Sequence, residues 1–259
     1  MSQAWIQNMV RIAVFDSGLG SLSIIKEMRK KFKAEIIYFA DNQNFPYGTK
    51  TVNQIKNIMK NSIYLLGKFE PDYIVIASNT PSLMLNLKSD KIFDVKPPIK
   101  DAKLISQTKN IGILATNSAL KSKGIDNFLK KNKENPYKFY KINASNLVEI
   151  VESGKFLSEK KSVQKIIRDE LEILLEKNID VVTLSSTHLP FLKKFLKKEF
   201  PDVKFIDPGK IVANEIYLKI KNNQSNRNTL KIFTSGDTKK FQKKLLKLGI
   251  KNKIIFLSF

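Results

Sequence analysis

Cysteine is absent from this chain of 259 residues, which also contains a single histidine and a single tryptophan. The absence of cysteine excludes disulfide bonds, zinc–thiolate sites and every mechanism that uses a thiol. Long apolar runs are missing too, since no stretch approaches the roughly 18–20 uncharged apolar residues that a membrane span needs. The first residues lack the basic region and apolar run of a signal peptide. We therefore expect a cytoplasmic protein.

Arginine is scarce as well, because only four of the 46 basic residues are Arg although the formal net charge is +22. Arg rather than Lys makes the bidentate contacts that read phosphates and bases. The lysines gather on the polar faces of predicted helices, as in the pairs Lys193-Lys194, Lys197-Lys198, Lys239-Lys240 and Lys243-Lys244. We interpret the charge as a solvated surface and expect no specific nucleic-acid site, although a positive field still attracts an anionic substrate.

What is present is an alternation of short apolar runs with longer helical patterns. With 42% apolar and 27% charged residues, the chain has the composition and length of one or two globular domains. Continuous apolar strands separated by helices indicate parallel sheets covered on both faces, so we expect an α/β fold of two similar domains with mainly parallel sheets. Strands are predicted at 11–15, 35–40, 73–77, 110–115, 137–142, 180–184, 203–206, 229–234 and 253–257, and helices at 22–32, 52–68, 118–131, 163–177, 190–198, 210–221 and 239–248.

Small polar clusters follow the apolar strands in two similar pairs. In open α/β sheets ligands bind at the carboxyl ends of the strands. Two units that each present two such ends suit a binding cleft between facing domains. We expect a first domain of residues 9–96 plus 208–259, a second of 97–207, and a tail at 1–8. The clusters are Asp16-Ser17-Gly18, Ser78-Asn79-Thr80, Thr116-Asn117-Ser118 and Ser186-Thr187-His188.

The segment from Asp16 to Gly20 places a carboxylate and two glycines at a strand end. One interpretation is a dinucleotide fingerprint, with Asp41 as the ribose-binding acid, but Ser23 breaks the G-x-G-x-x-G pattern. A carboxylate here suits a ligand ammonium or a proton transfer better than a pyrophosphate. A purely structural alternative is that Asp16 or Ser17 caps the following helix.

Two further features carry candidate chemistry. The loop at 41–50 contains Pro46-Tyr47-Gly48, a plain turn or a turn whose backbone N–H groups face a carboxylate ligand. His188 is the only histidine and follows Ser186 at a predicted ligand-binding edge. A Ser–His–Asp hydrolase is the alternative enzyme class, but the chain has no G-x-S-x-G elbow.

Together these segments resemble the glutamate racemases of the aspartate/glutamate racemase superfamily. The resemblance runs in order along nearly the whole chain. It rests on the motifs FDSGLGSLS (15–23), YFADNQNFPYGTK (38–50), IASNTPS (76–82), IGILATNS (111–118), LVEIVESG (147–154), LSSTHLPFL (184–192) and FTSGD (233–237).

The resemblance implies two facing α/β domains with the active site between them. It also implies a homodimer of a peptidoglycan-synthesis enzyme that inverts glutamate at Cα without cofactor or metal. One thiolate removes the Cα proton and a thiol on the other face returns one. By motif match, auxiliary acid/base groups fall on Asp16, Glu152 and His188. Substrate-binding positions fall on Asp16, Ser17, Pro46, Tyr47, Gly48, Asn79, Thr80, Thr116 and Thr187.

The chain departs from this family at the two catalytic positions, where Ser78 and Ser186 stand in place of the expected cysteines. A serine hydroxyl is a far weaker acid than a thiol unless a base activates it. Three explanations remain open. The chain is a Cys-free engineered form, a homologue that uses serine with one of the auxiliary groups, or a non-catalytic homologue that binds an acidic amino acid or has a regulatory role. In each case we expect Ser78 and Ser186 to face each other across a cleft that takes glutamate.

Overall fold

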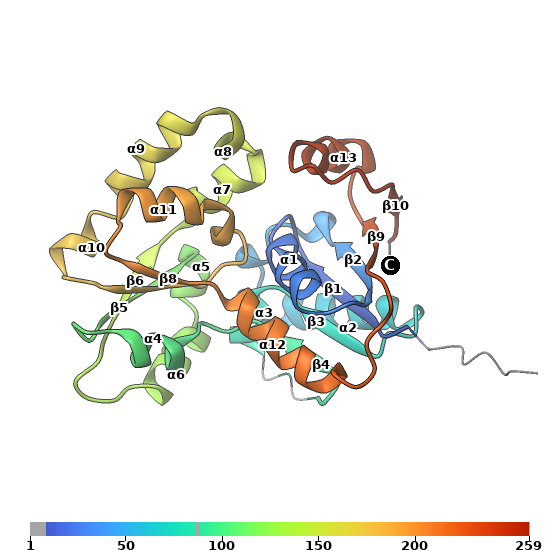
Figure 1. The fold of residues 1–259 in the computed structure, drawn as a ribbon, viewed down its shortest axis with the longest axis horizontal. Coiled ribbons are helices and arrows are strands. Elements are labelled where there is room, and N and C mark those ends of the chain that lie inside the picture. The colour runs from blue at the N-terminus through green and yellow to red at the C-terminus, as the bar shows by residue number, and fades with distance from the viewer. Residues whose placement is uncertain (1–8, 86, 88, 259) are drawn as a thin grey trace, which may run out of the picture.

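The computed structural model describes residues 9–85, 87 and 89–258, so the predicted tail at 1–8 lies outside the described residues. Two lobes lie side by side, and each is built on one parallel sheet (Figure 1). Every strand pairing in the described part of both sheets is parallel, as the continuous apolar runs predicted. Within that part, none of the helices has the length and apolarity to cross a membrane.

The first sheet has six strands in the order β10-β9-β2-β1-β3-β4. Successive residues of a strand point to opposite faces, so one side of β1 packs with α1, α12 and α13 and the other side packs with α2. The strands are β1 (Arg11–Asp16), β2 (Glu35–Ala40), β3 (Tyr73–Ile76), β4 (Ile92–Asp94), β9 (Thr229–Thr234) and β10 (Ile254–Phe256). The helices of this lobe are α1 (Ser21–Lys31), α2 (Val52–Gly67), α3 (Asn79–Met84), α12 (Pro208–Ile220) and α13 (Thr238–Lys247), with short 3₁₀ turns η1 (Asn42–Asn44) and η2 (Tyr47–Thr49).

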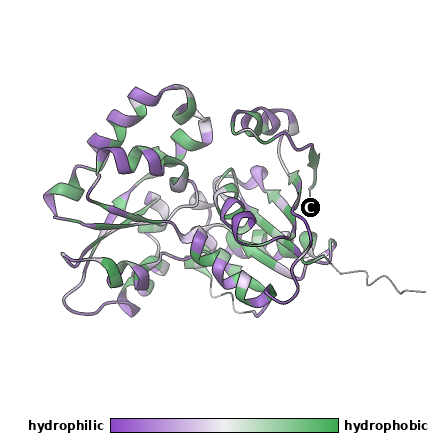
Figure 2. Cartoon of the chain, in the orientation of Figure 1, coloured by the Kyte–Doolittle hydropathy of each residue, from purple (hydrophilic) through white to green (hydrophobic). Residues whose placement is uncertain are grey.

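The second sheet has four strands in the order β6-β5-β7-β8 and is likewise covered on both faces. Its helices alternate hydrophilic and hydrophobic residues, because one side of each helix packs on the sheet and the other meets water (Figure 2). The strands are β5 (Asn110–Ala115), β6 (Lys138–Asn143), β7 (Val181–Leu184) and β8 (Lys204–Ile206). The helices are α4 (Ile99–Ile105), α5 (Asn117–Leu120), α6 (Lys123–Lys131), α7 (Ser145–Ser153), α8 (Lys155–Ser158), α9 (Lys160–Glu170), α10 (Ile173–Glu176) and α11 (Lys193–Glu199), with the 3₁₀ turn η3 (Leu189–Leu192).

The chain leaves the first sheet after β4, builds the whole second sheet, and returns through α12 to add β9 and β10. This path follows the predicted division of the chain, whose boundaries at 96/97 and 207/208 stay a prediction. Two predicted helices are wrong as single elements. The helix at 118–131 is broken because Ser122 caps a new helix, α6, by accepting a hydrogen bond from the N–H of Ile125. The helix at 163–177 begins earlier, at Lys160, and is interrupted between α9 and α10.

Candidate active site

The site lies where the strand order of each sheet reverses. In the first sheet, β2 lies on one side of β1 and β3 on the other, and β5 has the same position between β6 and β7. Such reversals open a crevice at the carboxyl ends of the two strands. Asp16 ends β1 and Ser78 follows β3, while Thr116 follows β5 and Ser186 follows β7. All four residues line one cavity of about 230 Å³.

The structure brings nearly all the predicted site residues to this cavity. Glu152 is the exception, because it lies behind His188 and does not line the cavity. The sequence prediction missed several wall residues on α5 and α7, among them Glu149. The LVEIVESG motif was the signal for α7, but no helix was predicted there. The predicted residues that line the cavity are Asp16, Ser17, Pro46, Tyr47, Gly48, Ser78, Asn79, Thr80, Thr116, Ser186, Thr187 and His188; the others are Phe45, Thr49, Ser118, Ala119, Ser145, Val148, Glu149 and Ser185.

Asp16 is 1% exposed and forms part of the cavity wall. Its Oδ1 accepts a hydrogen bond from the N–H of Ser17 at 2.6 Å, and its Oδ2 accepts one from the hydroxyl of Thr187 at 3.2 Å. Burial raises the pKa of Asp16 to about 6, against the lowering effect of the His188 charge and these hydrogen bonds. The carboxyl group can therefore change protonation state near neutral pH. The helix-capping interpretation is wrong, because α1 receives no side-chain cap.

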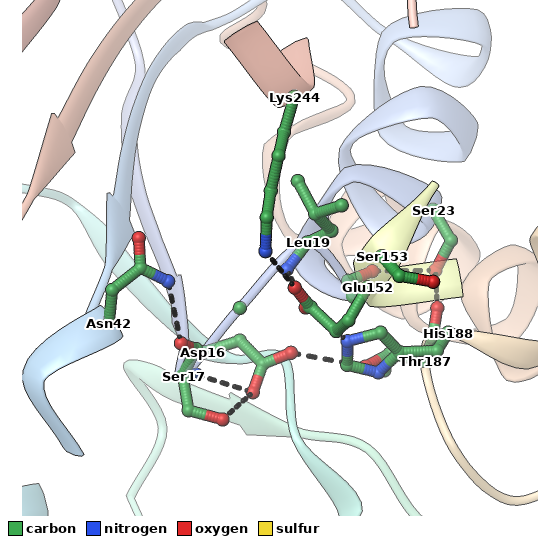
Figure 3. Close-up of polar contacts among 12 residues, drawn as sticks. Asp16, Ser17, Leu19, Ser23, Asn42, Glu152, Ser153, Thr187, His188 and Lys244 are labelled. Carbon is green, nitrogen blue, oxygen red and sulfur yellow. Dashed lines mark hydrogen bonds and ion pairs between the residues drawn. The ribbon is translucent and has the colours of Figure 1, made fainter. Parts of the chain in front are cut away.

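Glu152 and His188 form a buried pair beside Asp16 (Figure 3). Nε2 of His188 lies 2.7 Å from Oε1 of Glu152. Burial alone would raise the pKa of Glu152, but the hydrogen bond and charge of His188, with the charge of Lys244, hold it well below the usual range. Burial alone would lower the pKa of His188, but the hydrogen bond and charge of Glu152 outweigh burial and raise it. Each partner therefore favours the charged form of the other, an imidazolium beside a carboxylate.

The glycines of the β1–α1 turn leave space for these side chains. A Cβ atom on Gly18 would lie 2.1 Å from Oε1 of Glu152, and one on Gly20 would lie 2.2 Å from Oγ1 of Thr187. Gly20 has ordinary helical backbone angles, with φ −55° and ψ −41°, so it is the space and not the conformation that requires glycine. Glu152 and Thr187 of the second lobe come so close to this turn that only glycine fits at positions 18 and 20. The dinucleotide interpretation had assigned these glycines to a pyrophosphate.

The loop before α2 is held by a buried acid. Asp41 is fully buried, and its Oδ2 accepts hydrogen bonds from the hydroxyl of Tyr47 at 3.0 Å and from Nδ2 of Asn44 at 2.9 Å. The hydroxyl of Ser235 donates to its Oδ1. The interpretation of Asp41 as a ribose-binding acid is wrong, because these contacts make it the anchor of the loop that carries Tyr47 and Gly48.

Several predicted donors already have protein partners. The hydroxyl of Tyr47 donates to Asp41, Nδ2 of Asn79 donates to the carbonyl of Val95, and the hydroxyl of Thr187 donates to Asp16. Oδ1 of Asn79 is buried and has no partner among the described residues. These polar groups are therefore held in place by the protein itself.

The two serine side chains are nearly buried, with 8% of Ser78 and 9% of Ser186 exposed. Among the described residues, neither hydroxyl has a hydrogen-bond partner, and Ser78 does not cap α3. Neither therefore has a base within hydrogen-bond distance, which is the usual way a serine is activated. In the same part of the chain, no group of His, Asp and Glu side chains could hold a metal ion.

No protein-family model matches the chain, but known proteins do. It is 33% identical over 254 residues to a glutamate racemase from Clostridium novyi, covering 91% of this chain and 96% of that protein. A glutamate racemase structure from Francisella tularensis, in complex with D-glutamate, is 26% identical with a TM-score of 0.79 and covers 96% of this chain and 97% of its own. The fold is also that of isoform RacE1 from Bacillus anthracis, with a TM-score of 0.84, 23% identity and 98% of both chains covered.

Proposed function

The chain belongs to the glutamate racemase family of amino-acid racemases, and we propose that its cavity binds free glutamate and supports cofactor-independent inversion at Cα. The observation that carries this proposal is that residues of both lobes line one small cavity. Ser78 from one lobe and Ser186 from the other stand at the positions where the resemblance expects the two proton-transfer groups, and both line it. A planar intermediate between them would be accessible from both faces.

The polarity of the cavity suits an acidic amino acid. Asp16 is the carboxylate that can receive the ligand ammonium. Thr80 and Thr116 line the same cavity, and their hydroxyl groups are candidate donors to the ligand carboxylates. The net charge of +22 favours the approach of a dicarboxylate. The structure of the Francisella tularensis relative in complex with D-glutamate supports the same ligand for this chain.

Inversion requires one group to take the Cα proton from one face and a second group to donate a proton to the other face. A neutral serine can serve as the donor, but it takes a proton only after losing its own. Asp16 lines the same cavity and is a candidate to receive that proton, because its pKa of about 6 leaves it mostly ionised at neutral pH. We therefore propose a reaction far slower than one that uses two thiols, whose ordinary pKa is near 8.5.

A second candidate function follows from the serine hydroxyls themselves. Because neither has a base as hydrogen-bond partner among the described residues, the cavity also suits a protein that holds glutamate without turning it over. Such a protein would bind an acidic amino acid in a regulatory or interaction role. The homodimer that the resemblance implies and the cytoplasmic location expected from the sequence stay predictions.

Exchange of the Cα proton of glutamate in D₂O separates the two candidates. We expect very slow exchange with the chain as it stands and a strong acceleration after Ser78→Cys and Ser186→Cys are introduced together, since both faces regain a group that ionises near neutral pH. The single variants are the matched controls, and each should give at most one-sided exchange. Calorimetry with D- and L-glutamate, D- and L-aspartate and NAD measures binding alone.

The outcomes decide between catalysis and binding. Rapid inversion by the unaltered chain would show that a serine is activated and would contradict the slow reaction proposed here. An inert double variant that still binds glutamate would favour the binding-only function. Binding of NAD with no response to either amino acid would overturn the proposed ligand.

A further inference from the structure

Lys244 of helix α13 contacts the carboxylate of Glu152, which lies behind the cavity wall. Nζ of Lys244 lies 3.0 Å from Oε2 of Glu152, and Figure 3 shows its side chain extending from α13 toward that carboxylate. Helix α13 packs on the first sheet, whereas α7, which carries Glu152, packs on the second. The ion pair therefore joins the two lobes. The sequence prediction had counted Lys244 among the lysines of a solvated surface.

The contact completes the set of partners around Glu152. Its Oε1 lies 2.6 Å from the N–H of Leu19 and 2.7 Å from Nε2 of His188, and its Oε2 faces Lys244. The side chain of Glu152 is 9% exposed, so an oxygen without a partner would be costly. With both oxygens held, the carboxylate has one orientation, and that orientation presents Oε1 to the imidazole.

We propose that Lys244 is a positioning residue for His188, acting through Glu152: by holding Oε2 of Glu152, it keeps Oε1 on the imidazole. The purpose of this positioning rests on the proposed function, because His188 lines the cavity where glutamate would bind. The test of the positioning role is independent of the proposed function, because it needs neither substrate nor turnover.

The charged groups around His188 make the role of Lys244 measurable. Glu152 from α7 and Asp16 from β1 favour the imidazolium, and Lys244 from α13 opposes it. The phenol of Tyr38, from β2, faces the same cluster and donates to the carbonyl of Gly18. The hydrogen bond that His188 donates to Glu152 affects the pKa of His188 more than the charge of Lys244 does. Loss of the bond and loss of the charge therefore shift that pKa in opposite directions.

The sign of this shift separates positioning from simple proximity. If Lys244 holds Glu152 in place, Lys244→Met loosens the bond to the imidazole, and the pKa of His188 falls because burial is then less opposed. If Lys244 acts only as a nearby positive charge, its removal makes the pKa of His188 rise. Lys244→Arg keeps both the charge and the donor and should retain the parent value.

The experiment is a pH titration of the imidazole by NMR in the protein without ligand. His188 is the only histidine, so its ring signals need no assignment by mutation. The matched control is Lys243→Met, since Lys243 is exposed on the same helix and has no ion pair among the described residues. We expect a lower pKa for His188 in Lys244→Met, and the parent value in Lys244→Arg and Lys243→Met.

A rise in the pKa, no change, or an equal shift in the Lys243 control would overturn the proposal. A urea midpoint for each variant shows that the folded protein is being titrated. Glutamate calorimetry on the parent protein tests the proposed function separately. Failure to bind glutamate together with a lowered pKa in Lys244→Met would refute the function and leave the positioning role standing.

Discussion

Replacing Asp16 by asparagine should remove much of the pH dependence of stability between about pH 4 and pH 6. The pKa of this buried carboxyl is raised from 3.8 to about 6 in the folded protein, mainly by burial. At 1.36 kcal/mol per unit, the difference corresponds to about 3 kcal/mol between the two protonation states. Because the folded state binds the proton more tightly, folding stability falls as the pH rises through this window. The full cost is present above about pH 6.

Asp16→Asn stays neutral and keeps an acceptor for the N–H of Ser17, so it should escape this cost. We expect the free energy of unfolding of the variant, relative to the parent, to improve by about 3 kcal/mol between pH 4 and pH 8. Urea unfolding of the ligand-free protein at a series of pH values measures this difference. Asp202→Asn is the matched control, because Asp202 is exposed and its removal should leave the pH profile unchanged. A difference between Asp16→Asn and the parent that does not vary with pH would refute the reasoning.

Two further substitutions test the packing of the site. Gly20→Ala would place a methyl group 2.2 Å from Oγ1 of Thr187, so we expect loss of glutamate binding by calorimetry and a lower unfolding midpoint. Gly67→Ala, which has nothing within 4 Å of the added Cβ atom, should leave binding unchanged, and similar losses in both variants would contradict the argument. Tyr47→Phe removes the hydrogen bond to the buried Asp41 and should cost about 1.5–3 kcal/mol of unfolding free energy in urea. An unchanged midpoint would mean that the remaining partners of Asp41 are sufficient.

The fold was largely predictable because its signals are local. Strands β2, β5 and β9 have the predicted limits. The first two are almost entirely buried, and a strand buried on both faces reads as a nearly continuous apolar run. Strand β4 was missed because its three residues at an edge of the sheet, Ile92–Asp94, are too few to show a pattern. Helix α7 was missed although its apolar residues face the second core. Its N-terminus has no side-chain cap to mark where it begins.

The site was predictable as a set of strand ends but not as a network. The rule that ligands bind at the carboxyl ends of parallel strands predicted that Asp16, Ser78, Thr116 and Ser186 would lie together. No rule of sequence pattern indicates that Lys244 reaches Glu152, 92 positions away. That contact depends on how the two lobes pack, and a single sequence contains no record of lobe packing. The family resemblance identified Glu152 by its motif, but it did not indicate that Glu152 lies behind His188 and outside the cavity wall.

The path of the chain through the two sheets also determines the order in which strands can pair while the protein is being synthesised. Strand β2 pairs with β1 on one side and with β9 on the other, and β9 begins at Thr229. The outer edge of β2 therefore stays unpaired until the last part of the chain has been synthesised. The four strands of the second sheet all lie between Asn110 and Ile206, so that lobe can form completely while the first still has an open edge. An unpaired strand edge is a site of aggregation, and the nascent chain carries this one through most of its translation.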